Sequence, residues 1–252
     1  MLIKKVVGLF VKKIKNNAEY IQNYFEYAQE FKVFLRTHGE RFEVLRKDKY
    51  PCLYDKTKGT SFDKHYIYHT AWAARRLSAL KPVDHTDISS LTYFSTVVSA
   101  FIPVSFYDYR PVDIRLDNLT CNHADITALP FKNNSIRSLS CMHVIEHIGL
   151  GGYSDVLDVD GDLKAISELK RVLSIKGDLF FVVPIGKAKI MFNAHRIYSY
   201  DQVMSYFNDF ELQEFTLIPD QTDDALVINA TKEEADKQTY ACGCFWFKKK
   251  EG

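Results

Sequence analysis

Three side chains that can move protons or bind metal ions lie within five positions, at His143, Glu146 and His147. Four carboxylates follow closely: Asp155, Asp158, Asp160 and Asp162. If the segment is helical, His143 and His147 share a face at i, i+4, a spacing that chelates a divalent metal with aspartate oxygens as added ligands. One histidine can instead serve as a general base, because its pKa of about 7 suits removal of a hydroxyl proton. In a structural interpretation, Glu146 and His147 brace the loop and the aspartates cap the next helix.

A second polar segment reads FNAHRIY and runs from residue 192 to 198. Its His195 is a further candidate for proton transfer. Arg196 suits pairing with a phosphate or a carboxylate, and a solvated loop cation is the alternative. The segment therefore adds one candidate base and one candidate anion contact to the first group.

Alternating strand and helix patterns position these groups. We expect strands over 83–88, 103–107, a third ending near Ala124, 136–142 and 178–183, with a helix over 91–100. A helix over 199–207, with Ser199 as its cap, and strands over 211–218 and 240–247 complete the chain. The pattern predicts a Rossmann-like α/β fold, with a seven-stranded, mostly parallel sheet whose last two strands form an antiparallel pair.

Acidic residues end the first three predicted strands. Asp108 follows Asp87 by 21 positions, and Asp125 follows Asp108 by 17. In a doubly wound sheet these ends meet at one edge, where a nucleoside needs a tight turn, an acidic group for ribose hydroxyls and a polar contact for the base. The alternative is that the three aspartates only cap strand ends.

The motifs from residue 122 to 184 resemble those of class I S-adenosylmethionine-dependent methyltransferases. An aspartate precedes LPF, VIEHI follows the fourth strand, and a helix contains LKRVL before a glycine. The resemblance implies S-adenosylmethionine as cofactor, and a divalent metal is possible but not predicted. It assigns the cofactor to residues at the strand ends: Asp87, Ser89, Ser90, Asp108, Asp125, Ile126 and Met142. It also implies that His143, Glu146 and His195 act on the acceptor, with His195 as the first choice for the base.

The first turn departs from that family. It reads DISSLT, whereas the family has a glycine-rich turn that lets the backbone approach the cofactor closely. The wider pattern of HTDISS, HVIEHIGLG, DxDGD and FNAHRIY is similar to a methyltransferase-like branch catalogued as a domain of unknown function. This resemblance covers roughly residues 61–217. Members of that branch often accompany genes for surface-polysaccharide synthesis, which implies a sugar acceptor.

Composition limits the remaining options. A net charge of +1 over 252 residues provides no global field for nucleic acid, and the five cysteines indicate reduced thiols in a cytoplasmic protein. We expect a helical N-terminal extension over 1–80 and the Rossmann-like domain over 81–252. Residues 1–15 form a basic amphipathic pattern that can lie on an anionic membrane surface, as peripheral contact, or dock a partner. No run approaches the about 20 apolar residues of a membrane span.

Three functions remain open from the sequence. The first is O-methylation of a sugar or another small hydroxyl compound. The second is a non-catalytic methyltransferase-like module that binds a nucleotide or scaffolds glycan biosynthesis. The third is a metal-dependent hydrolase, which depends only on the loop rich in histidine and aspartate.

Overall fold

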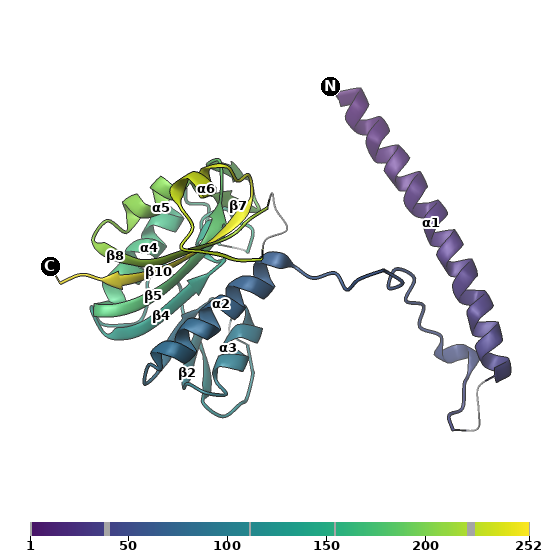
Figure 1. Ribbon diagram of the computed structural model, residues 1–252, viewed down its shortest axis with the longest axis horizontal. Coiled ribbons are helices and arrows are strands. Elements are labelled where there is room, and N and C mark those ends of the chain that lie inside the picture. Colours follow the sequence, from purple (N-terminus) through teal and green to yellow (C-terminus); the bar gives the residue numbers. More distant parts are fainter. Residues whose placement is uncertain (1, 38–40, 111, 154, 221–224, 252) are drawn as a thin grey trace. The chain divides into compact units, whose positions relative to one another are not determined.

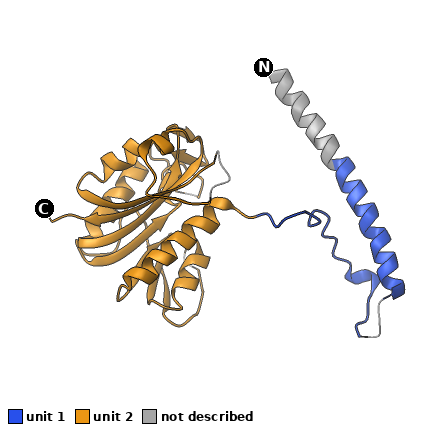
Figure 2. Ribbon diagram, viewed as in Figure 1, with its two compact units in different colours: residues 1–61 blue, residues 62–252 orange. Residues whose placement is uncertain are grey.

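The structure, a computed structural model, describes residues 2–37, 41–110, 112–153, 155–220 and 225–251, with side chains described from residue 17 onward. The chain forms two compact units, residues 1–61 and residues 62–252 (Figure 2). The division falls after Ser61, whereas the sequence analysis placed it after residue 80. The helix over 64–80 therefore belongs to the second unit.

The first unit contains α1 (Leu2–Thr37) and the short 3₁₀ helix η1 (Arg46–Asp48). An aromatic row lies along α1, in which Tyr20, Tyr24, Tyr27 and Phe31 have neighbouring ring centroids 6.1 to 6.3 Å apart. None of the helices in the described part of the chain is long and apolar enough to cross a membrane. Membrane contact through residues 1–15 stays a prediction, because those side chains lie outside the described residues.

The second unit is built on a sheet with the strand order β3-β2-β1-β4-β5-β10-β8-β9 (Figure 1). Its strands are β1 (His85–Ile88), β2 (Val104–Asp108), β3 (Leu119–His123), β4 (Ile136–Met142), β5 (Leu173–Ile185), β8 (Phe210–Ile218), β9 (Val227–Ile228) and β10 (Ala241–Lys249). The first five are parallel, and β10 is antiparallel to both β5 and β8. The predicted fold class is confirmed. Within the described residues this sheet has eight strands and not seven, because the two-residue β9 extends the edge beside β8.

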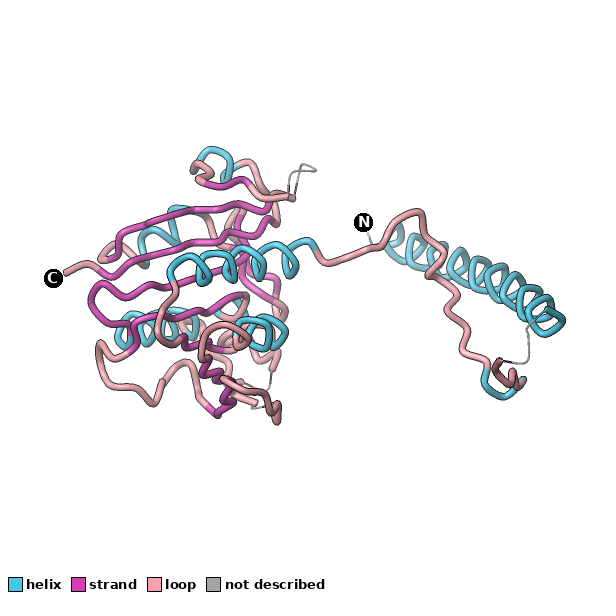
Figure 3. Tube along the Cα trace, turned by 60° about the horizontal axis from the view of Figure 1, so that its bottom comes forward, coloured by secondary structure: helices cyan, strands magenta, loops and turns pink. Residues whose placement is uncertain are grey.

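Helices cover both faces of this sheet (Figure 3). They are α2 (Lys64–Leu80), α3 (Thr92–Val98), α4 (Gly161–Val172), α5 (Tyr200–Tyr206) and α6 (Lys232–Asp236), with the 3₁₀ turn η2 (Ile145–His147). A small ribbon of β6 (Lys189–Met191) and β7 (His195–Ile197) follows β5. Phe180 and Val182 of β5 pack with α2 and α3, whereas Phe181 and Val183 pack with α4 and α5. This alternation shows a strand buried on both sides, as expected for the centre of a doubly wound sheet.

Helix α2 is fixed to the sheet by a buried polar contact. Trp72 Nε1 donates to Glu214 Oε1 at 2.7 Å, and Arg76 pairs with Glu214 at 2.8 Å. Glu214 lies on β8, so the contact joins residues that are 142 positions apart in the sequence. The start of α2, capped by Asp63, is thereby held near the carboxyl ends of the parallel strands.

Candidate functional site

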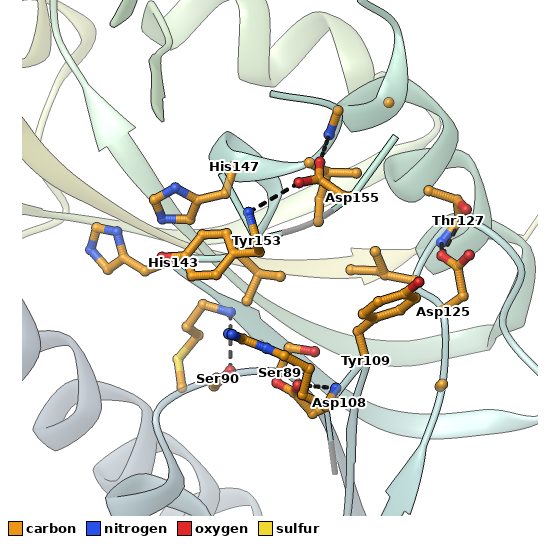
Figure 4. A pocket seen from close by; sticks show the side chains of 18 of the residues that line it. Ser89, Ser90, Asp108, Tyr109, Asp125, Thr127, His143, His147, Tyr153 and Asp155 are labelled. Atoms are coloured by element: carbon orange, nitrogen blue, oxygen red, sulfur yellow. Dashed lines mark hydrogen bonds between the residues drawn. The ribbon is translucent and has the colours of Figure 1, made fainter. Parts of the chain in front are cut away.

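A cavity of about 490 Å³ lies over the carboxyl ends of β1, β2, β3 and β4 (Figure 4). Its volume is within the range of small-ligand pockets. Six of the seven residues predicted to bind the cofactor line it: Ser89, Ser90, Asp108, Asp125, Ile126 and Met142. The loop after β4 forms another wall, including Tyr153 and Asp155. The strand ends thus converge on one ligand-sized space, as their spacing in the sequence predicted.

The turn after β1 closes without glycine. Ser89 has a φ of +56°, and its amide and hydroxyl both donate to Tyr107 O, at 2.7 and 3.2 Å. The neighbouring Ser90 Oγ accepts a hydrogen bond from Met142 N at 3.1 Å. A residue with a Cβ pays roughly 1 kcal/mol to adopt the left-handed region. Bonds to β2 and β4 therefore hold a backbone shape that glycine adopts freely.

Asp87 does not reach this cavity, which corrects the prediction that its carboxylate contacts a cofactor. It is fully buried and accepts hydrogen bonds from Ser140 Oγ and Ser95 Oγ, each at 2.5 Å. The ring of His85 lies beside it, between Ser138 Oγ at 2.8 Å and Ser140 Oγ at 2.9 Å. Burial raises the pKa of Asp87 to about 6. The carboxyl joins β1 to β4 and α3 beneath the cavity floor.

The other two strand-end aspartates do face the cavity. Asp108 Oδ1 accepts a hydrogen bond from Arg110 N at 2.7 Å, and Asp125 Oδ1 accepts from Thr127 N at 2.8 Å. Among the described residues the second oxygen of each carboxylate has no partner, so it can accept from a ligand hydroxyl or amine. Their direct contact with the cofactor stays a prediction.

Three of the four aspartates after His147 accept hydrogen bonds from the protein itself. Asp155 accepts from Gly149 N at 2.7 Å, and Asp158 accepts from Asp160 N at 3.0 Å. Asp162 is buried and accepts from Tyr198 Oη at 2.9 Å. No metal-ligand group within the described residues includes any of the four, and three of them are engaged by hydrogen bonds from the protein.

Arg196 is held by groups of the protein itself, so it is neither a solvated loop cation nor placed to contact the anion of a ligand. Its side chain is buried, and its guanidinium donates to Ile148 O at 2.6 Å and Val159 O at 3.2 Å. It lies 3.5 Å from the Asp162 carboxylate. The residue therefore ties β7 to the loop that walls the first cavity.

A second cavity, of about 370 Å³, adjoins the first. It is lined by Phe62, Asp63, Lys64, His65, Tyr66, His143, Glu146, His147, His195 and Tyr240. The three residues predicted to act on an acceptor, His143, Glu146 and His195, come together here. Tyr66, His143 and His147 line both cavities, so they form the junction between the two spaces.

His143 occupies a strand end and not a helix. It has a φ of +57° directly after β4, and the helical turn that follows covers only η2, so the predicted i, i+4 helical pair with His147 is wrong. His143 Nδ1 lies 2.7 Å from Glu146 Oε1. Burial lowers the pKa of His143 to about 3 and raises the pKa of Glu146 to about 7. The imidazole is therefore neutral at pH 7, the form that can accept a proton or bind a metal.

His147 and His195 have different roles in the second cavity. His147 Nδ1 donates to Ala194 O at 2.5 Å, which braces the loop against the β6–β7 ribbon, as one interpretation of the sequence held. The His195 ring lies 5.1 Å from the Tyr240 ring and 6.3 Å from the His147 ring, centroid to centroid. Burial lowers the pKa of His195, which favours the neutral base form.

His65, Tyr66 and Tyr240 line the second cavity but were not predicted from the sequence as site residues. His65 and Tyr66 lie in the first turn of α2, and Tyr240 directly precedes β10. A signal was present for the first of these, since His65 and His69 stand at i, i+4 on one predicted helix. Nothing local marks Tyr240, because it enters the site only through the strand order.

Comparison with solved structures shows what this architecture is. A putative sarcosine dimethylglycine methyltransferase from Galdieria sulphuraria superposes with a TM-score of 0.52 at 14% identity, covering 73% of this chain and 85% of that one. The chain has the class I methyltransferase fold. An N-methyltransferase from Bradyrhizobium japonicum, solved with S-adenosyl-L-homocysteine, gives a TM-score of 0.51 at 14% identity over 80% of this chain and 92% of its own. The resemblance inferred from the motifs is confirmed at the level of the fold.

Comparison by sequence leads to proteins without an assigned activity. A family model described as "Caenorhabditis protein of unknown function, DUF268" matches residues 127–243 of this methyltransferase-fold chain. A curated relative, an uncharacterized protein of Methanocaldococcus jannaschii, is 31% identical over 99 residues. Those residues are 38% of this chain and 37% of the relative, so the match spans little more than a third of either protein.

Proposed function

We propose that the protein transfers a methyl group from S-adenosylmethionine to a hydroxyl group of a small acceptor, with a carbohydrate as the acceptor class. The observation that carries the proposal is the pair of adjoining cavities, of about 490 and 370 Å³, at the carboxyl end of a methyltransferase-type sheet. The first takes the cofactor and the second the acceptor. They meet at Tyr66, His143 and His147, where the methyl group crosses.

Each part of the cofactor has a matching group in the first cavity. Asp108, with one carboxylate oxygen unpartnered among the described residues, suits the ribose hydroxyls, and Asp125 with Ile126 suits the base. Ser89 and Ser90 form the turn for the amino-acid end. Met142 lines the cavity beside the junction residues and would contact the sulfonium end of the cofactor. When bound, S-adenosylmethionine supplies an electrophilic methyl group attached to positively charged sulfur.

The second cavity supplies the base. The acceptor oxygen forms a bond to the methyl carbon while the carbon–sulfur bond breaks, and the hydroxyl proton passes to His195. The burial of His195 favours the neutral ring that this step requires. Most of the rate comes from alignment of oxygen and methyl carbon, because a sulfonium is already a reactive leaving group.

The cofactor half of the proposal is tested by calorimetry with S-adenosylmethionine and S-adenosylhomocysteine. We expect one site per chain, weakened in Asp108→Asn and unchanged in Asp113→Asn, a matched substitution of an aspartate whose side chain is 79% exposed and lies outside both cavities. Equal affinity in wild type and Asp108→Asn would remove Asp108 from the site. No binding of either compound would favour the non-catalytic alternative.

The transfer half is tested by release of S-adenosylhomocysteine in the presence of nucleotide sugars, free sugars and simple phenols. We expect acceptor-dependent release with the carbohydrate group. Release with amines and not with any hydroxyl compound would contradict O-methylation.

A non-catalytic module remains the second candidate, and the observation in its favour is the turn Ser89–Ser90 in place of glycine. The third function, a hydrolase using the aspartate loop, has lost its support. Asp155, Asp158 and Asp162 hold their own loop and neighbouring elements.

A further inference from the structure

Two imidazoles and one thiol lie together where α2, the end of β4 and the start of β10 meet. His65, His143 and Cys242 each offer one ligand atom, and these atoms all lie within 4.8 Å of one another. The three residues come from elements far apart in the sequence, so only the fold brings them together. His65 and His143 also line the second cavity.

Unpartnered polar atoms lie in and around this cluster. Across the described residues, three buried side-chain nitrogen or oxygen atoms have no hydrogen-bond partner: His69 Nε2, His143 Nε2 and Glu146 Oε2. The His69 and His143 rings lie 5.0 Å apart, and Glu146 contacts His143 directly. Buried polar groups without partners are rare in folded proteins, and one of these three, His143 Nε2, belongs to a residue of the ligand group.

The orientation of His143 identifies the kind of ligand. Its Nδ1 is engaged by Glu146 Oε1 at 2.7 Å, which leaves Nε2 as the free ring nitrogen. A histidine that binds a metal through one nitrogen almost always directs the other at a carboxylate or a carbonyl oxygen, which fixes the tautomer and the ring. Glu146 therefore has the position of an orienting carboxylate, and His143 Nε2 that of a metal ligand.

We propose that His65, His143 and Cys242 bind a divalent transition-metal ion of the zinc class. Two imidazoles and a thiolate form a borderline-soft donor set, which suits zinc and does not suit magnesium or calcium. Ligand atoms around a tetrahedral zinc are roughly 3.5 Å apart, given bonds of about 2.0 to 2.3 Å. The observed group reaches that spacing with side-chain shifts of about 1 Å. Binding releases the Cys242 thiol proton to solvent.

The proposed ion has three protein ligands and an open fourth position. Because His65 and His143 line the second cavity, that position faces the cavity and can hold water or a polar group of a bound molecule. Structural zinc sites are closed by four protein ligands, whereas sites that act on ligands keep one position open. The geometry therefore favours a site that contacts whatever enters the second cavity.

The test uses the full chain, stripped with a chelator and titrated with zinc alone by calorimetry, with metal content measured independently. We expect one zinc per chain. His65→Gln and Cys242→Ser should each weaken binding by more than about 100-fold, and Glu146→Gln by about 10- to 100-fold, the range for loss of an orienting partner. Wild-type affinity in both His65→Gln and Cys242→Ser would overturn the proposal.

Two matched controls separate the site from its neighbourhood. Cys244→Ser alters a buried thiol on the same strand, with its Sγ 3.9 Å from that of Cys242, and should leave zinc affinity unchanged. His123→Gln removes an exposed histidine outside the cluster and should do the same. Zinc binding lost only in His123→Gln would show a surface site and refute the assignment.

Cobalt(II) gives a readout of the ligand atoms themselves. The cobalt-substituted protein should show a thiolate-to-cobalt charge-transfer band in the near ultraviolet, absent from Cys242→Ser and present in Cys244→Ser. A bound cobalt ion without this band would exclude Cys242 as a ligand. If Cys242→Ser does not fold, His65→Gln at a half-buried position carries the test. Neither experiment includes S-adenosylmethionine or an acceptor, so the outcome is separate from that of the proposed methyl transfer.

Discussion

The two cavities of the second unit are built in different ways. The first is formed mostly by loops that follow β1, β2, β3 and β4, and its carboxylates Asp108 and Asp125 keep oxygens free for a ligand. The second draws its walls from α2, the β4 end, β7 and the segment before β10, and several of its titratable groups are buried with shifted pKa values. Burial of titratable groups is typical of sites that perform chemistry. The contrast supports the proposed division, in which the first cavity binds the cofactor and the second holds the reacting groups.

The largest effect on the proposed difference between the two cavities is expected at His195, in the second cavity. His195→Ala should lower turnover by about 100-fold or more, the contribution of a positioned general base, while cofactor affinity stays nearly intact. The measurement is turnover of an identified acceptor against pH, together with calorimetry for S-adenosylmethionine. Phe192→Ala, an exposed side chain in the same segment (75% exposed) outside both cavities, is the matched control. Equal rates in wild type and His195→Ala, or collapse of cofactor affinity, would show that His195 is not the base.

The buried carboxyl group of Asp87, beneath the first cavity, is the subject of the next prediction. The pKa of Asp87 is raised to about 6 by burial from an ordinary value of 3.8, so between these values the folded state binds more protons than the unfolded state. Stability due to this group is present below about pH 4 and decreases as the pH rises to about 6, by roughly 3 kcal/mol at most. Asp87→Asn should remove that decrease. Urea unfolding of both proteins from pH 4 to 7 measures the difference.

Asp87→Asn also tests whether Asp87 is separate from the residues that line the first cavity. Because Asp87 does not line the cavity, we expect S-adenosylmethionine affinity to change by less than about threefold once the protein is folded. A pH profile identical in wild type and mutant would contradict the raised pKa. A large loss of affinity at constant stability would return Asp87 to the ligand site.

Asp108 lines the first cavity, so its substitution should lower cofactor affinity and leave stability nearly unchanged, the reverse of what we expect for Asp87. Asp108→Ala should weaken S-adenosylmethionine by about 10- to 100-fold, since a charge-assisted bond to a ribose hydroxyl contributes roughly 1.5 to 3 kcal/mol. Stability should change little, because within the described residues the carboxylate accepts a single backbone hydrogen bond, from Arg110. Calorimetry and urea unfolding measure the two quantities. Stability lost without affinity lost would mean that Asp108 only caps the strand.

Local sequence signals predicted much of the fold. The strand over 136–142 was predicted with its observed bounds, and Ser199 caps α5 through a capping box with Gln202. Both depend on neighbouring residues alone. From the sequence, helix α2 was placed in the N-terminal extension, whereas the structure groups it with the second unit, through an anchor (Trp72 on Glu214) that spans 142 positions. Cys242 and His65 could not be connected for the same reason, since no local pattern encodes which helix start lies beside β10.

Burial was the other quantity that the sequence could not supply. Asp87, Asp108 and Asp125 have the same residue type and a regular spacing, yet only the first is fully buried. Its burial follows from Ser95 and Ser140, whose hydroxyls satisfy both carboxylate oxygens. Arg196 is similar, because its own side chain is buried and its guanidinium donates to the backbone carbonyls of Ile148 and Val159. Candidate residues were thus found by type and spacing, but their roles depend on partners from other elements.

The smallest effect is expected at Ser89, where the first cavity departs from a glycine turn. Ser89→Gly relieves roughly 1 kcal/mol of backbone strain at a φ of +56°. It also loses the hydrogen bond from Ser89 Oγ to Tyr107 O and adds conformational freedom to the unfolded chain, which both oppose that gain. The free energy of unfolding should therefore change by less than about 1 kcal/mol. Without a Cβ the backbone can approach the cofactor more closely, and we expect S-adenosylmethionine to bind up to a few-fold more tightly. Ser90→Ala is the contrasting control, because it leaves the buried Met142 N without its acceptor and should lower stability by about 1 to 3 kcal/mol. Calorimetry measures the S-adenosylmethionine affinity of both variants, and urea unfolding measures their stability. An affinity at least tenfold weaker in Ser89→Gly would mean that the Ser89 hydroxyl itself binds the cofactor. Serine would then replace glycine at this position for recognition.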